Sequence, residues 1–249
     1  MKYKAIMLDL DDTTVVHGKK SLPSARVADA IARAKERIHV CIATARTLTD
    51  TMPVLSHLQL SGPCIVTNGT QIYDPITKKI IWEVSLPKGV VPDVYTICKH
   101  YNLRSLHSNG MEDLEYTGGK IPEKILSIYI PEVDMQMVDE VAGKLRQISG
   151  INVQKLTAWN KRYMSIDVTH SEASKLHGIM EVAKILGITT DEIIGVGDGY
   201  NDFSLLMACG LKIAMGNAID ELKAIADFVA PTVYEDGVAT VIEKFVLTG

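Results

Sequence analysis

The stretch "MLDLDDT", residues 7–13, places three carboxylates within four positions directly after an apolar run. In an extended strand the side chains at i and i+2 point to the same side, so Asp9 and Asp11 can face one point beyond the strand's carboxyl end. Like charges at such a point require either a raised carboxyl pKa or a cation between them. A hard divalent cation with oxygen ligands, such as Mg²⁺, meets this requirement. The alternative is a turn in which the aspartates make only local hydrogen bonds.

On either side of the middle of the chain, short apolar runs alternate with helical patterns. In the first part we expect strands over 3–10, 38–43 and 63–67 and helices over 23–36 and 47–59. In the last part we expect strands over 192–196, 211–215 and 228–230 and helices over 174–186, 201–208, 220–226 and from 238 onward. Such alternation predicts βαβ units around a parallel sheet.

The middle of the chain has a different pattern. We expect alternating, half-buried strands over 125–130, 151–156 and 163–168, and helices over 90–101 and 134–148. Several such strands with two helices indicate an α+β module on an antiparallel sheet, inserted into a parallel α/β domain. The sequence therefore predicts an α/β fold whose core is formed by residues 1–84 and 170–249, with an inserted module of residues 85–169.

A second acidic cluster, "GVGDGYND" at residues 195–202, follows another apolar strand. Asp198 and Asp202 could complete a metal site begun by Asp9, because ligands of open α/β sheets bind at the carboxyl ends of the strands. The glycine spacing lacks the full Gly-x-Gly-x-x-Gly form of a dinucleotide site, and Asp198 would stand where a pyrophosphate needs bare amides. The plainer alternative is a glycine turn capped by Asn201 or Asp202 at the next helix, and capping and metal binding can coexist there.

Two further side chains stand where an anionic oxygen could be held. Thr44, in "IATART" at residues 42–47, ends a third strand, where its hydroxyl and the amides leading into the next helix could bind such an oxygen. Lys175 opens a predicted helix, although the helix dipole favours lysines in the last turn. The alternatives are a helix cap for Thr44 and a solvated surface lysine for Lys175.

Composition narrows the class of function. The 249 residues carry a formal net charge of -4 without a dense basic stripe, so a small ligand is a better expectation than nucleic acid. The four cysteines are scattered without ligand spacing, and we expect them to be reduced and buried. No apolar run approaches membrane-spanning length, so we expect a cytoplasmic protein without membrane association. Nothing in the pattern indicates an oligomeric state.

Taken in chain order, the motifs resemble those of a known superfamily. The stretches at residues 9–13, 44–46, 175 and 197–202 resemble the signature of the haloacid dehalogenase (HAD) superfamily. With the Thr67-Asn68-Gly69 turn, the chain is similar over essentially its whole length to the Cof-type phosphatases of that superfamily. The resemblance implies a Rossmann-like core with an inserted cap. It also implies Mg²⁺-dependent hydrolysis of a small phosphorylated metabolite, such as a sugar phosphate or a phosphoglycolate-like acid.

The resemblance further implies a role for each site residue. Asp9 would attack phosphorus and become an aspartyl phosphate, while Asp11 would protonate the leaving oxygen and later deprotonate water. Thr44 and Lys175, helped by Asn201, would bind the phosphoryl group. The implied metal ligands are the Asp9 side chain, the Asp11 carbonyl and Asp198, with Asp202 near or in the same shell.

Two positions depart from the family pattern, and two other activities fit the same motifs. Asp12 stands where many Cof-type members have glycine, and Ala45 replaces the commoner glycine of the second motif. The alternatives are a sugar-phosphate phosphomutase and a non-enzymatic phospho-receiver or metabolite-binding regulator. A receiver would need neither an inserted cap nor an acid such as Asp11. The cap, residues 85–169, is the segment expected to select the leaving group.

Overall fold

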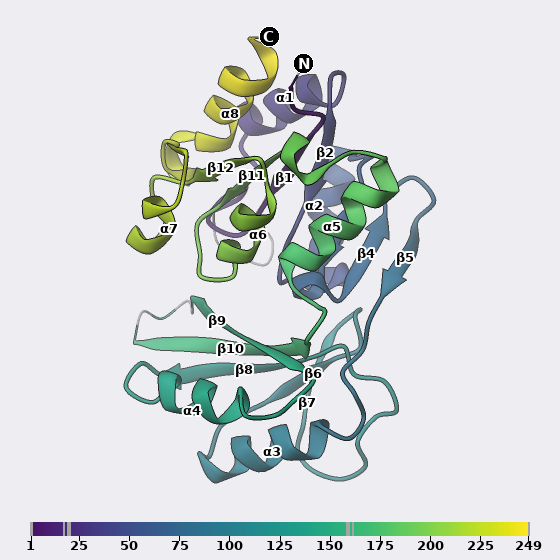
Figure 1. Ribbon diagram of the computed structural model, residues 1–249, viewed down its shortest axis with the longest axis vertical. Helices are drawn as coiled ribbons and strands as arrows, with labels where there is room; N and C mark the ends of the chain where they lie inside the picture. The colour runs from purple at the N-terminus through teal and green to yellow at the C-terminus, as the bar shows by residue number, and fades with distance from the viewer. Residues whose placement is uncertain (1, 17, 19–20, 158–159, 161, 249) are drawn as a thin grey trace.

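The computed structural model describes residues 2–16, 18, 21–157, 160 and 162–248 of the chain. Figure 1 shows two parts, one above the other, with both ends of the chain at the far end of the upper part. The upper part is a parallel sheet flanked by helices, and the lower part is an antiparallel sheet with two helices on the side away from the upper part. The α/β class expected from the sequence is therefore confirmed.

The core sheet has five strands in the order β13-β12-β11-β1-β2, and all of these neighbours pair in parallel. Its strands are β1 (Ala5–Leu8), β2 (His39–Ile42), β11 (Ile193–Gly197), β12 (Leu211–Ala214) and β13 (Phe228–Val229). β1 lies inside the sheet between β11 and β2 and is fully buried, which explains its unbroken apolar run. The strand is shorter than the expected 3–10, so Asp9 and Asp11 lie beyond its end. The amide of Asp9 still donates to the carbonyl of Val196 at 2.9 Å.

Six α-helices complete the core within the described part of the chain, with ends within two residues of the expected ranges. They are α1 (Ala25–Ala34), α2 (Leu48–Leu58), α5 (Lys175–Leu186), α6 (Asp202–Ala208), α7 (Asp220–Ala224) and α8 (Gly237–Ile242). Side-chain caps fix where three of them begin: the hydroxyls of Ser24, Thr47 and Ser174 each accept a backbone N–H from the first turn of α1, α2 and α5. The last of these caps sets Lys175 as the first residue of α5.

A second sheet, which the sequence analysis did not predict, extends the core next to β2. It pairs β3 (Cys64–Val66), β4 (Gln71–Asp74) and β5 (Lys79–Glu83) in antiparallel order, and an isolated parallel bridge from Ala43 to Ile65 connects β3 to the end of β2. The turn after β3 contains Gly69 with φ +95°, and a Cβ there would lie 2.3 Å from the carbonyl oxygen of Ser174. The glycine thus lets this turn pack directly against the start of α5.

The lower part, the cap, is a five-stranded antiparallel sheet in the order β7-β6-β8-β10-β9. Its elements are α3 (Val91–His100), β6 (Leu106–Ser108), β7 (Asp113–Glu115), β8 (Ser127–Asp134), α4 (Val138–Leu145), β9 (Ile151–Thr157) and β10 (Tyr163–His170). The expected helix over 134–148 is too long, because Asp134 belongs to β8. Pro131 interrupts the apolar alternation of that strand, so the sequence pattern does not predict the second half of β8. Pro131 lies next to a bulge in the pairing of β8 with β10. The short β6 and β7 were not expected.

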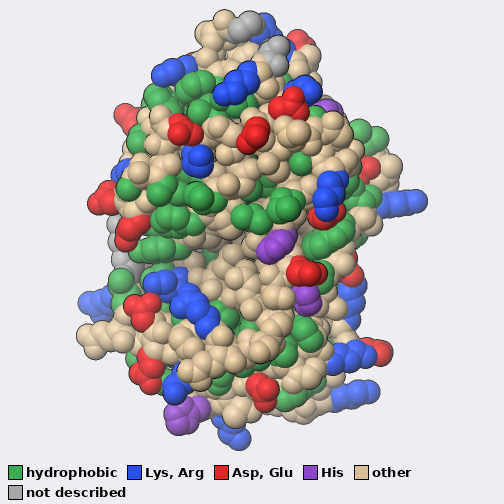
Figure 2. All heavy atoms as spheres, viewed as in Figure 1, with side chains coloured by type: hydrophobic (Ala, Val, Ile, Leu, Met, Phe, Trp, Pro, Cys, Tyr) green, Lys and Arg blue, Asp and Glu red, His purple; other side chains and the backbone are tan. Residues whose placement is uncertain are grey.

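Two hydrophobic clusters correspond to the two parts. One draws on residues 5–73 and 179–246, and the other on residues 86–168. They fall on either side of 84/85 and 169/170, which we keep as the proposed domain limits. On the face shown in Figure 2, acidic and basic side chains are interspersed over both parts. The four cysteines are free and buried, as expected, and no helix in the described part of the chain is long and apolar enough to span a bilayer.

Candidate active site

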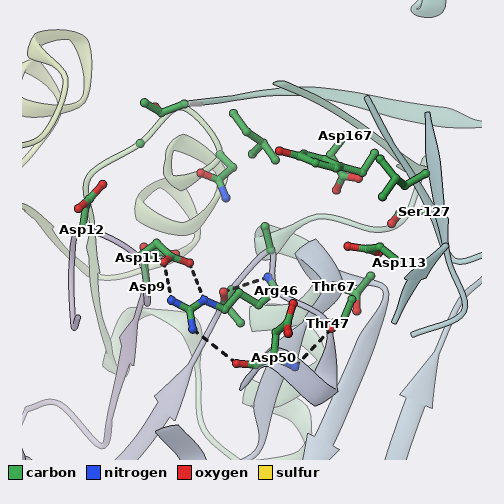
Figure 3. A pocket seen from close by; sticks show the side chains of 18 of the residues that line it. Asp9, Asp11, Asp12, Arg46, Thr47, Asp50, Thr67, Asp113, Ser127 and Asp167 are labelled. Carbon is green, nitrogen blue, oxygen red and sulfur yellow. Dashed lines mark hydrogen bonds and ion pairs between the residues drawn. The ribbon is translucent and has the colours of Figure 1, made fainter. Parts of the chain in front are cut away.

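A cavity of about 450 Å³ lies between the carboxyl ends of the core strands and the cap sheet (Figure 3). The sequence-predicted residues that line it are Asp9, Asp11, Thr44, Asp198, Asn201 and Asp202. Lys175 is not part of the lining but contacts it from within the protein, through Asp9 and Asp202. The structure thus brings together all seven residues, which come from four separate segments of the chain.

Lys175 is fully buried beneath the cavity. Its ammonium group donates to Oδ1 of Asp9 and, at 2.6 Å, to Oδ1 of Asp202. Burial alone would lower the pKa of Lys175, but the charges and hydrogen bonds of Asp202 and Asp9 raise it above its ordinary value. The alternative of a solvated surface lysine is therefore wrong. The lysine stands at the start of α5, against the helix dipole, because the two carboxylates hold it there.

Asp9, Asp198 and Asp202 form a compact carboxylate cluster. One oxygen of each lies within 4.8 Å of the others. Burial and the charge of Asp202 raise the pKa of Asp9 to about 7, against the opposing effect of Lys175, and burial and the charge of Asp9 raise the pKa of Asp198. Three carboxylates with one ammonium leave a deficit of positive charge in a buried place. The donor set is all oxygen, so a hard divalent cation such as Mg²⁺ fits the site.

Asp202 also fixes the loop that carries Asp198. Its Oδ2 accepts the backbone N–H groups of Asp198 and Gly199, each at 2.9 Å, while Oδ1 accepts from Lys175. Asn201 occupies the N-cap position of α6, but its side chain makes no capping hydrogen bond and instead lines the cavity. The alternative that Asn201 caps this helix is therefore wrong. Asp202 has its hydrogen-bonding capacity largely used by protein donors, so its main effect is to position Lys175 and the Asp198 loop.

The partner of Asp11 was not predicted from the sequence. Arg46 binds the Asp11 carboxylate with two hydrogen bonds, Nε to Oδ2 at 2.8 Å and Nη2 to Oδ1 at 2.6 Å (Figure 3). Nη2 also donates to the carbonyl of Gly18 at 3.0 Å. A bidentate guanidinium fixes both the position and the orientation of a carboxylate. The sequence feature that could have predicted this pair is the position of Arg46, two residues after Thr44. Both follow a strand that ends at the same edge of the sheet as the strand before Asp11.

The second motif holds Thr44 at the cavity wall. Its amide donates to the carbonyl of Ile65, and its hydroxyl oxygen accepts the amide of Arg46 at 3.1 Å. The cap of α2 is Thr47 and not Thr44, so the alternative of a helix cap for Thr44 is wrong. Ala45 does not adopt a positive φ, so this position has no conformational need for the commoner glycine.

Asp12 replaces glycine at a position with left-handed backbone. Its φ is +56°, a region that glycine enters freely and that aspartate tolerates better than most residues. Its amide donates to the carbonyl of Val15 at 2.9 Å, and its own carbonyl accepts the side-chain amide of Asn217 at 2.8 Å. These contacts hold the turn that follows Asp11 closed.

The cap contributes acidic and hydroxyl side chains to the opposite wall. Asp113, Ser127 and Asp167 come from β7, β8 and β10 and face the cavity (Figure 3). Oδ2 of Asp167 accepts the side-chain amide of Asn68 at 2.9 Å, so this contact joins the cap to the core. Burial raises the pKa of Asp167 to about 7, with the hydrogen bond from Asn68 opposing this shift and the charge of Asp113 adding to it. The alternation along β10 predicts a half-buried strand and does not assign its polar positions to a site.

The raised pKa of Asp167 predicts a pH dependence of stability. Below its ordinary pKa of 3.8 the carboxyl group is protonated in both the folded and the unfolded chain; between 3.8 and about 7 only the folded chain keeps the proton. The contribution of Asp167 to the free energy of unfolding should therefore fall by ~1.4 kcal/mol for each unit by which the pH rises through this window. Asp167→Asn cannot ionise, so we expect it to be more stable than the parent near pH 8, by up to a few kcal/mol.

Urea denaturation of the parent and Asp167→Asn at several pH values measures this effect. The advantage of the variant should shrink as the pH falls and be lost near the ordinary pKa of 3.8. The matched control is Asp93→Asn at an exposed position of α3, which should leave the pH profile of stability as it is in the parent. A difference between parent and Asp167→Asn that is the same at all pH values would contradict the assignment.

Comparison with known proteins shows the family of the chain. The family model of the haloacid dehalogenase-like hydrolases matches residues 6–114 and 107–242. The chain belongs to the haloacid dehalogenase-like hydrolase family. The expected membership of the HAD superfamily and of its Cof-type branch is thereby confirmed, and the chain is an enzyme of the phosphatase class.

Relatives in this family match the chain over nearly its full length. It is 28% identical to 5-amino-6-(5-phospho-D-ribitylamino)uracil phosphatase YcsE of Bacillus subtilis, over 98% of this chain and 96% of that protein. It is 25% identical to pyridoxal phosphate phosphatase YbhA of Escherichia coli, over 97% of this chain and 98% of that protein. A solved haloacid dehalogenase-like hydrolase from Bacteroides thetaiotaomicron superposes with a TM-score of 0.79 at 26% identity, covering 97% of this chain and 99% of the other.

Proposed function

We propose that this HAD-family phosphatase is a Mg²⁺-dependent hydrolase of small phosphomonoesters, sugar phosphates or phosphoglycolate-like acids, that acts through an aspartyl phosphate on Asp9. The observation that carries the proposal is the buried contact of Asp9 with Lys175 at the base of a cavity closed by the cap. A nucleophile held by a buried cation, beside further carboxylates, suits attack on a phosphoryl group. Both named relatives act on phosphorylated small molecules, which supports the substrate class.

In the first step Asp9 attacks phosphorus with Oδ2, since Lys175 holds Oδ1. The bond between phosphorus and the ester oxygen breaks, and Asp11 gives its proton to that oxygen as the alcohol leaves. In the second step Asp11 takes a proton from water, the water oxygen attacks phosphorus, and the bond to Asp9 breaks to release phosphate. Arg46 holds Asp11 in place through its two hydrogen bonds.

The remaining site residues bind the phosphoryl oxygens. Lys175 places a buried positive charge beside the group under transfer, where it offsets the charge of the transition state. The Thr44 hydroxyl uses its oxygen to accept from Arg46, which leaves its hydrogen to donate to a phosphoryl oxygen. Asn201, whose side chain lines the cavity without capping α6, supplies a further donor. Asp202 positions Lys175, as its hydrogen bonds indicate.

The metal would be held by the Asp9 side chain, the Asp11 carbonyl and Asp198, with Asp202 at the edge of the site. When bound, Mg²⁺ neutralises carboxylate charge and polarises the phosphoryl oxygens. The hydrogen bond from the Thr13 hydroxyl to Oδ1 of Asp198, at 2.8 Å, orients that ligand. We place the enzyme in the cytoplasm, which its four buried free cysteines suit.

Metal removal tests this proposal. With Mg²⁺ present, the enzyme should release phosphate from p-nitrophenyl phosphate, and excess EDTA should lower the rate by at least about 10²-fold because the carboxylate cluster is left uncompensated. Added Mg²⁺ should restore the rate. Full activity in EDTA would contradict the proposal. The phosphomutase alternative stays a prediction, and the same assay tests it: an isomerised sugar phosphate formed without free phosphate would favour that activity.

A further inference from the structure

Thr67 lies on the cavity wall, between core and cap, with an unused hydroxyl. Its side chain is 2% exposed, and its Oγ1 has no hydrogen-bond partner among the described residues. Its φ is +48°, a left-handed conformation that is rare for a β-branched residue. A buried hydroxyl without a partner and a strained backbone both lower the stability of the fold. Features of this kind are found most often at ligand-binding and active sites.

The turn around Thr67 is held firmly in this conformation. The amide of Thr67 donates to the carbonyl of Arg46 at 2.7 Å, and the amide of Asn68 donates to the carbonyl of Thr44 at 2.9 Å. The side chain of Asn68 then binds Gln154 at 2.7 Å and Asp167 at 2.9 Å. The backbone of Thr67 is therefore fixed relative to both the proposed phosphate-binding residues and the cap.

The groups across from Thr67 can exchange hydrogen bonds with alcohol groups. Ser127 supplies a hydroxyl that hydrogen-bonds to Asp167, and Asp167, which is 5% exposed, supplies a carboxyl group (Figure 3). An alcohol group donates to a carboxylate and accepts from a hydroxyl, so Thr67, Ser127 and Asp167 together suit such groups. We call these three residues the leaving-group pocket.

The charge of the surrounding wall is negative. Glu112 and Asp113 line the cap side of the cavity, together with Asp167, which is only partly ionised near pH 7 because its pKa is raised to about 7. Among the described lining residues the one basic side chain is Arg46, and Asp11 holds it with two hydrogen bonds. A second anionic group on the substrate would thus meet like charges without a free counter-charge from these residues, which is unfavourable in a partly desolvated cavity.

We propose that Thr67 is a substrate-binding residue that, with Ser127 and Asp167, selects leaving groups bearing uncharged hydroxyls and rejects those bearing a carboxylate. This inference rests on the phosphatase function proposed above and narrows it. Within the two substrate classes proposed there, it favours sugar and polyol phosphates over phosphoglycolate-like acids. The physical basis is that the free protein, in the part of the chain that the structure describes, leaves the Thr67 hydroxyl without a hydrogen-bond partner. A hydroxyl-bearing substrate supplies that partner when it binds, which makes its binding more favourable.

A matched pair of substrates tests the selection. Sorbitol 6-phosphate and 6-phosphogluconate differ at the far end of the chain, where one has a CH₂OH group and the other a carboxylate. The parent enzyme with Mg²⁺ should have a kcat/KM for sorbitol 6-phosphate at least about tenfold above that for 6-phosphogluconate. Equal values, or a preference for 6-phosphogluconate, would overturn the inference.

Thr67→Val tests the residue itself, because valine keeps the shape and β-branching and removes the hydroxyl. The ratio of kcat/KM for sorbitol 6-phosphate to that for p-nitrophenyl phosphate, which carries no alcohol group, should fall about 10- to 100-fold. The Tm without substrate should stay the same or rise, because an unpaired buried hydroxyl is removed. A lower Tm with an unchanged ratio would show a purely structural role and overturn the inference.

The control is Thr70→Val, the same change in the same turn but outside the cavity lining. The hydroxyl of Thr70 donates to the carbonyl of Thr67 at 3.0 Å, so this variant should lose Tm and keep the substrate ratio of the parent. If the parent releases no phosphate from any of the three compounds, the phosphatase proposal fails, and the inference fails with it. If it releases phosphate but Thr67→Val and Thr70→Val change the ratio alike, only the inference fails.

Discussion

Asp9→Asn should lower Mg²⁺-dependent phosphate release by at least about 10³-fold, the largest effect that we expect of any single substitution in this enzyme. The amide keeps the shape of the side chain but is a far weaker nucleophile than a carboxylate. It also cannot form the ion pair with Lys175 that lies at the bottom of the cavity. The measurement is kcat with p-nitrophenyl phosphate at saturating Mg²⁺.

The neighbouring carboxylate provides the control for Asp9→Asn. Asp12→Asn removes the charge of another acidic side chain in the same turn and keeps the backbone hydrogen bonds of this position, and asparagine tolerates its left-handed φ. This variant should keep most of the parent's activity. Similar losses in both variants would mean that the general charge of the turn, and not the nucleophile, determines the rate.

Lys175→Met should remove activity by about 10²- to 10³-fold and also destabilise the fold by about 3–5 kcal/mol. Methionine approximates the length of the lysine chain without its charge, so Asp9 and Asp202 are left buried beside each other without the ammonium that bonds both. Urea denaturation in EDTA measures the free energy of unfolding without compensation by metal. Adding Mg²⁺ should then stabilise Lys175→Met more than the parent, because the variant has the larger deficit of positive charge.

Lys184→Met is the matched control on the same helix, α5. Lys184 is exposed and forms an i,i+3 ion pair with Glu181, an arrangement that contributes little to stability. We expect a change within about 0.5 kcal/mol and unaltered phosphate release. If Lys175→Met were as stable as Lys184→Met, the buried lysine would not be what holds the carboxylate cluster together.

The sequence could predict that the candidate site residues lie together because the core sheet is parallel. Asp9, Thr44 and Asp198 each follow an apolar run, and in a parallel sheet the ends of such runs meet at one edge. The alternation of short strands and helices was enough to predict this arrangement, and the caps Ser24, Thr47 and Ser174 explain why the helix starts were close to those observed.

The partners of these residues could not be predicted in the same way. The pairing of Arg46 with Asp11 depends on the rotation of each side chain beyond its strand end, which the period of a strand does not specify once β1 has ended at Leu8. Lys175 looked misplaced because the carboxylates that hold it lie 166 and 27 residues away along the chain. Contacts of this kind follow from the assembled fold.

The cap wall was the least predictable part of the site. Asp167 stands on a strand whose polar alternation usually indicates a solvent face, but here that face is covered by the core. The three-residue strands β6 and β7 are too short to show a period. The sequence predicts Thr67 as the last residue of a strand and the first of a turn, whereas its positive φ and unused hydroxyl are apparent only in the folded chain.

The aspartyl phosphate on Asp9 is the central claim, and trapping it is the most direct test. The enzyme is mixed with substrate and Mg²⁺, quenched in acid within milliseconds, and digested for peptide mapping by mass spectrometry. We predict a phosphoryl group on the peptide that contains Asp9 in the parent, and none in Asp9→Asn. Substrate turnover with no phosphoryl group on that peptide at any quench time, or with the group on another residue, would contradict the account.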